Sequence, residues 1–491
     1  MTKSPYAGAA ACLVVISIGA SVYVHARGYT LFYGDAEAHL NIARRWFDSR
    51  TPGPEQLGTV WLPLPHLLMT PFVLVDCLWR NGLAGVIPSC ICFVLAGMFL
   101  FASVRSLLSL KAACAALAVF ALNPNMLYLQ SLPMTESVFA AALLGLLWTT
   151  LRFRETQLLT YVLAAAAASV AASLTRYEGW FLIPFVTLFF LIGARKKWHA
   201  FVFGALAALA PLAWIAPNQF YWSDALAFYH GPYSALAIYQ RQLAQGLAGY
   251  PGGHNWLRAI QYFSAAVTSV GGWPVLTLAT CGIVVAVFSK KLYWPLLLLA
   301  LPPVFYVMSI HSSGTPVYVP YLWPNSWYNT RYGLAALPLL ALLAAALVNQ
   351  TPGRAAWIAV AVAALGATVA SPITWKESQV NSIARRAWTN ESAAYLKDHY
   401  TTGEGILYYF GDLAGVFREA GIPLREGLHQ DNRQTWDPAV LRPDLFLHEE
   451  WALAVEGDPV SNAMRNAHRY KIVKRVIVKD APVVEIYRRD Q

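Results

Sequence analysis

Long apolar runs, separated by short polar connections, make up the first three quarters of the chain. Eleven of these runs are long enough to cross about 30 Å of hydrocarbon as helices. They lie at residues 6–25, 84–104, 110–127, 135–151, 157–174, 179–194, 198–216, 264–288, 292–309, 332–349 and 355–371. This pattern predicts a polytopic α-helical membrane protein with about eleven transmembrane helices.

Lysine and arginine residues mark every second connection between these runs. The basic connections contain Arg105 and Lys111, Arg152 and Arg154, Arg195–Lys197, Lys290–Lys291, and Arg354. Because cytoplasmic loops are enriched in Lys and Arg, we expect these five connections and the N-terminus in the cytoplasm. The other connections then share the outer face with the C-terminal tail; they are residues 27–83, 128–134, 175–178, 217–263 and 310–331.

Two apolar segments need separate treatment in this topology. Residues 62–79 are apolar, but counting them as a span would invert every later connection, so we expect a helix lying at the outer interface. The run at 6–25 is followed by Ala26-Arg27-Gly28, which is a poor signal-cleavage site, so we expect an uncleaved first span. The predicted location is the inner (cytoplasmic) membrane.

The composition agrees with a membrane protein and divides the chain in two. Hydrophobic residues make up 57 % of the sequence and charged residues only 13 %, so an ordinary soluble protein is excluded. We expect the lipid bilayer, and no nucleic acid, as a partner. Residues 372–491 hold 33 of the 62 charged side chains, which predicts a membrane domain over 1–371 and a water-soluble domain over 372–491.

The tail alternates helical and strand-like segments. We predict helices over 376–400 and up to about residue 420, and the predicted strands lie at 406–410, 444–447, 471–479 and 483–488. Alternation of this kind indicates a small α/β domain, expected on the outer, periplasmic face.

Asp35 and Glu37 form a small acidic island directly after the first span. A carboxylate next to hydrocarbon is costly unless it faces water, a partner or a substrate, so such an acid is a candidate functional residue. The sequence from Asp35 predicts an amphipathic helix in which Asp35 and His39, four residues apart, share one face. Helix capping by Asp35 is the alternative explanation for this acid.

Glu136 is the second candidate acid, at the outer entrance to the fourth span. Thr135 is expected to cap that helix, and Glu136 there would also favour its positive N-terminal dipole. The carboxylates of the membrane part gather on the predicted outer side, which suggests one reaction centre there.

Several arginines lie on the predicted outer side, against the positive-inside bias. They include Arg44, Arg176 and Arg331, of which the last two lie at span ends beside Tyr and Trp. Because a guanidinium group fits phosphate oxygens, we expect these arginines to bind a lipid phosphate. The alternative is that their side chains simply extend to the membrane interface.

The predicted outer loop over 217–263 is rich in aromatic residues. Aromatic faces stack on sugar rings, and Asp224 within this loop is a candidate contact for an acceptor. An aromatic belt at the level of the lipid headgroups is the alternative.

In their order along the chain, these motifs resemble the GT-C superfamily of membrane glycosyltransferases. The resemblance is to the branch that holds the protein O-mannosyltransferases and the lipid A aminoarabinose transferases. It rests on the acid after the first span, Trp61-Leu-Pro-Leu-Pro-His66, Gly85-Val-Ile-Pro88-Ser89, Asn123-Pro124, Arg176, Arg331-Tyr332 and Leu337-Pro338. It implies a GT-C-like fold of about eleven transmembrane helices with a small C-terminal α/β domain on the outer face.

The resemblance also implies a reaction. A sugar would pass, with inversion, from a polyprenyl-phosphate donor to an acceptor on the outer face: a protein, a lipid or a glycan. Asp35 would be the general base, with Glu136 and Glu37 orienting the acceptor. The donor phosphate would be bound by Arg176, Arg331 and Arg44, and further substrate contacts are expected from His39, His66, Trp61, Glu178, Tyr332 and Asp224.

Two questions stay open at the level of sequence. A divalent cation, Mg²⁺ or Mn²⁺, held by Asp35 and Glu136 is one alternative, although this chain has Asp-Ala-Glu where relatives often have adjacent Asp-Glu. A transporter or flippase for a lipid-linked or envelope substrate is the competing function, and a non-catalytic envelope scaffold is a third. The chain shows no internal repeat typical of transporters, which favours the transferase.

Overall fold

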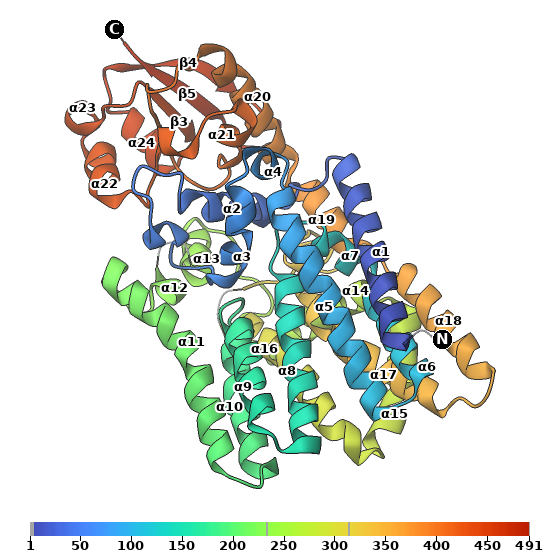
Figure 1. Ribbon diagram of the computed structural model, residues 1–491. Coiled ribbons are helices and arrows are strands. Elements are labelled where there is room, and N and C mark those ends of the chain that lie inside the picture. The colour runs from blue at the N-terminus through green and yellow to red at the C-terminus, as the bar shows by residue number, and fades with distance from the viewer. Residues whose placement is uncertain (1–3, 232–233, 313–314, 491) are drawn as a thin grey trace. The chain divides into compact units, whose positions relative to one another are not determined.

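The computed structural model of the chain describes residues 4–231, 234–312 and 315–490 (Figure 1). Two compact units share them. Unit 1 consists of Met1–Tyr29, Thr59–Pro65 and Val86–Glu377, and unit 2 of Thr30–Gly58, His66–Gly85 and Ser378–Gln491. The units therefore do not follow a single division at residue 371, because two segments of the first predicted outer loop group with the C-terminal tail.

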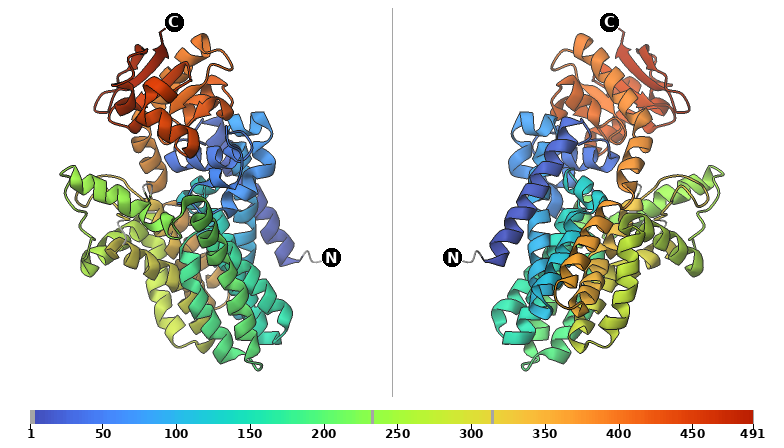
Figure 2. Two further views of the ribbon diagram at one scale, coloured as in Figure 1. Left: turned by 90° about the vertical axis from the view of Figure 1, so that its left-hand side faces the viewer. Right: turned by 90° about the vertical axis from the view of Figure 1, so that its right-hand side faces the viewer.

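Unit 1 is built from helices that run side by side (Figures 1 and 2). Within the described ranges, seven helices are long and apolar enough to cross a membrane, and two bent helix pairs bring the number to nine. The helices are α1 (Pro5–Ala26), α5 (Leu83–Leu107), α6 (Leu110–Ala121), α7 (Pro124–Gln130), α8 (Glu136–Thr156), α9 (Leu159–Ser173), α10 (Glu178–Gly193), α11 (Trp198–Trp222), α12 (Ala227–His230), α13 (Ala235–Ala244), α14 (Trp256–Gly271), α15 (Trp273–Val287), η2 (Lys290–Leu292), α16 (Tyr293–Ser312), η3 (Thr330–Ala336), α17 (Leu337–Gln350) and α18 (Ala355–Thr368).

All eleven predicted spans fall on helices of this unit. Two of them, α9 and α10, are only 15 and 16 residues long, and two others correspond to the bent pairs. The first pair, α6 and α7, bends by 64° where Asn123 caps α7 ahead of Pro124. The second pair, α14 and α15, bends by 111° at Gly272, whose positive φ of 73° is a conformation that glycine adopts readily.

Four of the five connections that were predicted to be cytoplasmic are joined by contacts at or next to them within unit 1. Lys111 donates a hydrogen bond to the carbonyl of Gly353, and the backbone N–H of Arg195 donates to the side chain of Gln157 over 2.9 Å. These contacts join connections that the charge pattern places on the same side of the membrane.

Unit 2 combines the outer-loop helices with the tail. The loop contributes α2 (Gly34–Arg45), η1 (Pro54–Leu57), α3 (Leu64–Val73) and α4 (Asp76–Arg80). The tail begins at α19 (Ile373–Asn381), which contains the boundary between the units, and continues with α20 (Ile383–His399), α21 (Gly415–Ala420), η4 (Leu424–Glu426), α22 (Arg433–Leu441), α23 (Pro443–Phe446) and α24 (Pro459–Met464). The helix expected over 376–400 is therefore divided at Ser382.

A five-stranded mixed sheet forms the centre of unit 2. The strands are β1 (Ile406–Tyr408), β2 (Gly427–Leu428), β3 (Trp451–Val455), β4 (Tyr470–Val476) and β5 (Val484–Arg489), in the order β2-β1-β3-β5-β4. β1 pairs in parallel with β2 and β3, with Ile406 opposite Gly427 and Trp451, whereas β5 is antiparallel to both β3 and β4. The α/β class of the tail is thereby confirmed.

One predicted strand is wrong. Residues 444–447 lie mostly in the short helix α23, which starts with Pro443 at its first position, where the fixed φ of proline favours a helix start. Leu445 and Phe446 are 56 % and 51 % exposed, so this apolar run is not a buried strand. β2 and β3 were not predicted.

Both faces of the sheet are covered. Side chains alternate along β1, so that Ile406 and Tyr408 face one hydrophobic core and Leu407 faces the other. The first core includes Leu40 of α2 together with residues of α3, α4, α20 and α21. The second core is made by tail residues alone. The loop helices are thus part of the folded core around the tail's sheet.

Candidate active site

Arg176 is the centre of a polar network in unit 1, in the short connection between α9 and α10. Its Nε donates to Glu178 over 2.8 Å, and its Nη1 donates to the Thr135 hydroxyl over 2.6 Å and to Glu136 over 3.2 Å. Nη2 donates to the hydroxyl of Tyr306 over 2.6 Å, and this hydroxyl in turn donates to Glu178. All three guanidinium nitrogens of Arg176 therefore have acceptors inside the protein.

Glu136 connects this network to Arg331. Its Oε1 atom lies 3.2 Å from Arg176 Nη1 and 3.4 Å from Arg331 Nε. The ring of Tyr332 lies near both guanidinium groups, with centroid distances of 5.6 Å from Arg176 and 5.5 Å from Arg331. Arg331 and Glu178 are buried. The network thus balances two arginines against two glutamates, as buried charges require.

The network joins residues that the sequence placed at separate span ends. Glu136 begins α8, Glu178 begins α10, and Arg331 and Tyr332 belong to η3. These residues lie at or next to the ends of predicted spans that the sequence analysis places toward the outer face, and that location stays a prediction. Thr135 is the N-cap residue of α8 as expected, but its side chain makes no capping bond, and its hydroxyl accepts from Arg176 instead.

Helix α2 presents a buried polar face within unit 2. Glu37, Asn41 and Arg45 are spaced four residues apart, which places them on one side of the helix, and they are 3 %, 0 % and 1 % exposed. Arg418 of α21 donates to both Glu37 oxygens, over 2.9 and 3.0 Å. The side-chain amide of Asn41 donates to the carbonyl of Ala414 over 2.9 Å.

The pKa of Glu37 reflects this contact. Burial alone would raise it, but the charge of Arg418 and its hydrogen bonds outweigh burial and lower the pKa below its ordinary value. Glu37 is therefore a carboxylate held in an ion pair of unit 2.

Arg45 makes a second buried ion pair with the tail. Its Nη1 lies 2.7 Å from Asp431 and 3.2 Å from Nδ1 of His429, and its Nη2 donates to the carbonyl of Gln56 over 3.0 Å. The guanidinium group also lies over the ring of Phe410, 3.9 Å from its centroid. Burial and the neighbouring charges of Arg45 and Arg50 hold the pKa of His429 well below its ordinary value, so this histidine is neutral.

Asp35 lies on a different side of α2. It is the second residue of the helix and is half-buried, and the N-cap position belongs to Tyr33, so the alternative that Asp35 caps the helix is wrong. Asp35 precedes Glu37 by two residues, which is a rotation of about 200° around the helix axis. His39 shares the side of Asp35, and its Nδ1 lies 2.9 Å from Nε2 of His66 in α3. The structure therefore brings together these two histidines, both expected to contact substrate.

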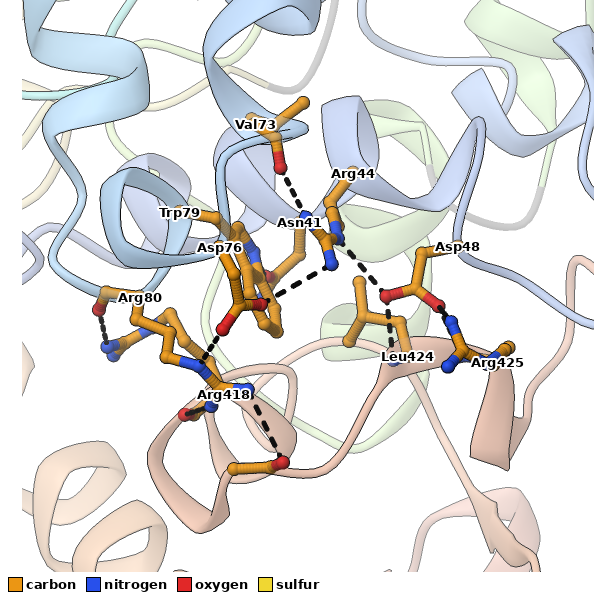
Figure 3. Close-up of polar contacts among 11 residues, drawn as sticks. Asn41, Arg44, Asp48, Val73, Asp76, Trp79, Arg80, Arg418, Leu424 and Arg425 are labelled. Atoms are coloured by element: carbon orange, nitrogen blue, oxygen red, sulfur yellow. Dashed lines mark hydrogen bonds and ion pairs between the residues drawn. The ribbon is translucent and has the colours of Figure 1, made fainter. Parts of the chain in front are cut away.

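The side chain of Arg44 makes hydrogen bonds to other residues of unit 2 (Figure 3). Its Nε donates to Asp48 over 3.1 Å, its Nη1 to the carbonyl of Val73 over 2.5 Å, and its Nη2 to Asp76 over 3.4 Å. The guanidinium group also lies 4.8 Å from the ring centroid of Trp79. These contacts are those of an arginine that fastens α2 to α3 and α4.

Trp61 and Asp224 are the remaining predicted residues. Trp61 is half-buried in the short segment Thr59–Pro65 of unit 1. Asp224 is 37 % exposed, accepts from the backbone N–H of Leu226, and lies 3.2 Å from Nδ1 of His230. Over the part of the chain that the structure describes, no group of three His, Cys, Asp or Glu side chains is arranged to hold a metal ion.

Sequence reasoning missed several residues of these networks. Tyr306 lies within the apolar run 292–309, and Arg418, His429 and Asp431 lie more than 370 residues after the loop residues that they contact. Neither spacing nor local composition carries a signal for such contacts.

Comparisons with known proteins agree with this architecture. Residues 72–222 match the family described as dolichyl-phosphate-mannose-protein mannosyltransferase. No curated protein matches the sequence.

Solved structures match over nearly the whole chain. ArnT from Cupriavidus metallidurans bound to undecaprenyl phosphate has a TM-score of 0.63 and 12 % identity, over 96 % of this chain and 97 % of that chain. Its apo state has a TM-score of 0.62 and 13 % identity, over 97 % and 98 %. The Archaeoglobus fulgidus oligosaccharyltransferase, in complex with Zn and sulfate, has a TM-score of 0.50 and 12 % identity, over 90 % and 68 %.

These relatives are GT-C glycosyltransferases. The chain therefore has the GT-C membrane fold with a small C-terminal sheet region, which confirms the expected resemblance and fold class, while the count of eleven spans and the outer location of the tail stay predictions.

Proposed function

We propose that the protein is an integral-membrane glycosyltransferase that uses a polyprenyl-phosphate sugar as its donor. The observation that carries the proposal is the match, over 96 % of this chain, to a structure bound to undecaprenyl phosphate. The matching mannosyltransferase family over residues 72–222 supports the same class of reaction. The acceptor is a hydroxyl-bearing molecule on the outer face of the membrane.

In the proposed reaction, the acceptor oxygen attacks the anomeric carbon of the sugar. The bond between that carbon and the phosphate oxygen breaks, the configuration inverts, and polyprenyl phosphate leaves with the bonding electrons. Asp35 accepts the proton of the acceptor hydroxyl as general base. A half-buried carboxylate in the first turn of a helix fits this role, because it is partly desolvated and still accessible.

Arg331 is the proposed contact for the departing phosphate. Phosphate gains negative charge as the bond breaks, and a fixed guanidinium group stabilises that charge. Arg176 has its nitrogens committed to Glu178, Glu136 and Tyr306, so we assign to it the task of holding Glu136 and Glu178 in place. Glu37 and Arg44 receive structural roles for the same reason.

The test is a transfer assay with the purified protein in lipid nanodiscs. Undecaprenyl-phosphate sugars with a radiolabelled sugar are incubated with extracted envelope lipids and proteins as acceptors. The proposal expects label in a new product together with release of undecaprenyl phosphate. If the donor is bound but recovered unchanged with every acceptor fraction, while labelled lipid moves across vesicle membranes, the protein is a flippase and the proposal fails.

A further inference from the structure

The loop segment around α2 is fastened to the tail at several points along its length. Before the helix, Arg385 of α20 donates to the carbonyls of Leu31 and Phe32, over 3.0 and 2.6 Å. After the helix, Asp48 accepts from the backbone N–H groups of Leu424 and Arg425, each over 3.3 Å (Figure 3). Between these two points, Glu37, Asn41 and Arg45 on the buried face of α2 make hydrogen bonds to the tail. The segment is therefore held before, along and after the helix.

The two ion pairs on that buried face have opposite polarity. In the first, the loop provides the acid Glu37 and the tail provides Arg418. In the second, the loop provides Arg45 and the tail provides Asp431. A helix that reversed or slid by about two turns would place like charges together, and a slide of one turn would break both ion pairs, so this arrangement selects one register of α2 on the tail. We call these two ion pairs the tail clamp.

The pairs are also costly to break. All four side chains are buried, and removing one partner leaves a buried charge without compensation. Trp79 of α4 also binds the buried face of α2, because its Nε1 donates a hydrogen bond to the side chain of Asn41 over 3.0 Å. Arg80 and Arg418 each donate to the other's backbone carbonyl. The clamp is thus embedded in a rigid set of hydrogen bonds.

Asp35 belongs to α2 as well, but it lies on a different side of this helix from Glu37. The helical rotation of about 200° between Asp35 and Glu37 means that the face held by the tail is not the face that presents Asp35. Rotating or tilting α2 would turn the carboxylate of Asp35 with it. Because misplacement of a catalytic group by about 1 Å can cost about 100-fold in rate, the attachment of α2 bears directly on turnover.

We infer that the C-terminal tail positions the general base Asp35, with Arg418 and Asp431 acting as positioning residues through the tail clamp. This inference rests on the proposed transferase function and on the role of Asp35 in it. It assigns the tail a part in turnover: the tail holds the catalytic helix in one orientation.

The first experiment measures transfer kinetics of Arg418→Ala and of the swapped variant Glu37→Arg/Arg418→Glu. We expect Arg418→Ala to lower kcat about 10- to 100-fold, with the KM for the undecaprenyl-phosphate sugar within about twofold of the wild type. The swapped variant should recover at least tenfold in kcat over Glu37→Arg alone. Arg442→Ala, which breaks the exposed Arg442 and Asp444 pair of the tail, is the matched control and should retain full activity.

A second measurement is independent of activity. Hydrogen exchange of the backbone amides of α2 is compared between the wild type and Arg418→Ala in nanodiscs, with β3 as the internal reference for a folded tail. We expect faster exchange over residues 34–45 and unchanged exchange over residues 451–455.

The possible outcomes distinguish a failure of the positioning inference from a failure of the proposed function. If the wild type transfers sugar and Arg418→Ala keeps its kcat, the inference is overturned while the proposed function stands. If the wild type transfers no sugar, the proposed function fails. Unchanged exchange of α2 in Arg418→Ala overturns the clamp whatever the activity.

Discussion

At the scale of single residues, Arg176 and Arg331 both belong to the polar network around Glu136. Arg176 donates to four side chains, Glu178, Thr135, Glu136 and Tyr306, and so links the N-terminal ends of α8 and α10 to the interior of α16. The sequence predicted both arginines to be cations of the outer side. It could not distinguish them, because the acceptor Tyr306 lies in an apolar run without any local mark of its role.

Arg331→Ala is expected to weaken binding of undecaprenyl phosphate by about tenfold or more. A hydrogen bond to a charged group contributes about 1.5–3 kcal/mol, and this substitution removes the proposed phosphate contact. Binding can be measured by titrating the lipid into the purified protein, with undecaprenol as the ligand that lacks the phosphate. Arg354→Ala, which changes an exposed arginine, is the control. Equal affinities for Arg331→Ala and the wild type would remove Arg331 from the phosphate site.

At the scale of elements, local pattern predicted helices well and the tail's strands less well. An apolar run of about 20 residues has few alternatives to a helix in a membrane, and all eleven runs are helical. The strand expected at 444–447 is a short helix, because Pro443 favours a helix start there. The loop helices join the core around the tail through contacts such as that of Glu37 with Arg418, and no local signal marks such a pairing.

His429, directly after β2, is expected to make the stability of the protein sensitive to acid. His429 lies 3.2 Å from Arg45 and 3.9 Å from Asp431, and its pKa is well below its ordinary value because of burial and the charges of Arg45 and Arg50. The unfolded chain, with a histidine pKa of about 6.5, then binds the proton more readily than the folded one. The contribution of His429 to the free energy of unfolding is fully present above about pH 6.5 and decreases as the pH falls below that value.

We therefore expect His429→Asn to lose less thermal stability between pH 7 and pH 5 than the wild type. The asparagine amide oxygen can replace Nδ1 as the acceptor for Arg45, and it does not titrate. Thermal unfolding of the purified protein at the two pH values measures this difference. His468→Asn, at an exposed histidine of the same unit, should match the wild type. An equal acid-induced loss of Tm in His429→Asn would contradict the assignment.

At the scale of the whole molecule, charge asymmetry predicted an alternating topology. Within unit 1, Arg195 contacts Gln157 and Arg176 contacts Glu136, each pair joining neighbouring span ends, and the orientation of the spans stays a prediction. The division at residue 371 came from composition alone. Composition could not show that Thr30–Gly58 and His66–Gly85 group with the tail, because such grouping depends on long-range packing.

The predicted sidedness can be tested with alkaline phosphatase, which is active only outside the cytoplasm. We expect an active enzyme when it is fused after residue 491 and an inactive one when it is fused after residue 290, in the basic connection of Lys290 and Lys291. The opposite pattern at the two sites would place the tail in the cytoplasm.

The central claim is that Asp35 removes a proton during sugar transfer. The most direct measurement compares transfer from an undecaprenyl-phosphate sugar by the wild type, Asp35→Asn and the control Glu55→Gln, which changes another carboxylate of the same loop. Because general base catalysis contributes about 10²- to 10⁴-fold, Asp35→Asn should lose transfer by that factor while still binding undecaprenyl phosphate, and Glu55→Gln should remain active. Full transfer by Asp35→Asn would contradict the account.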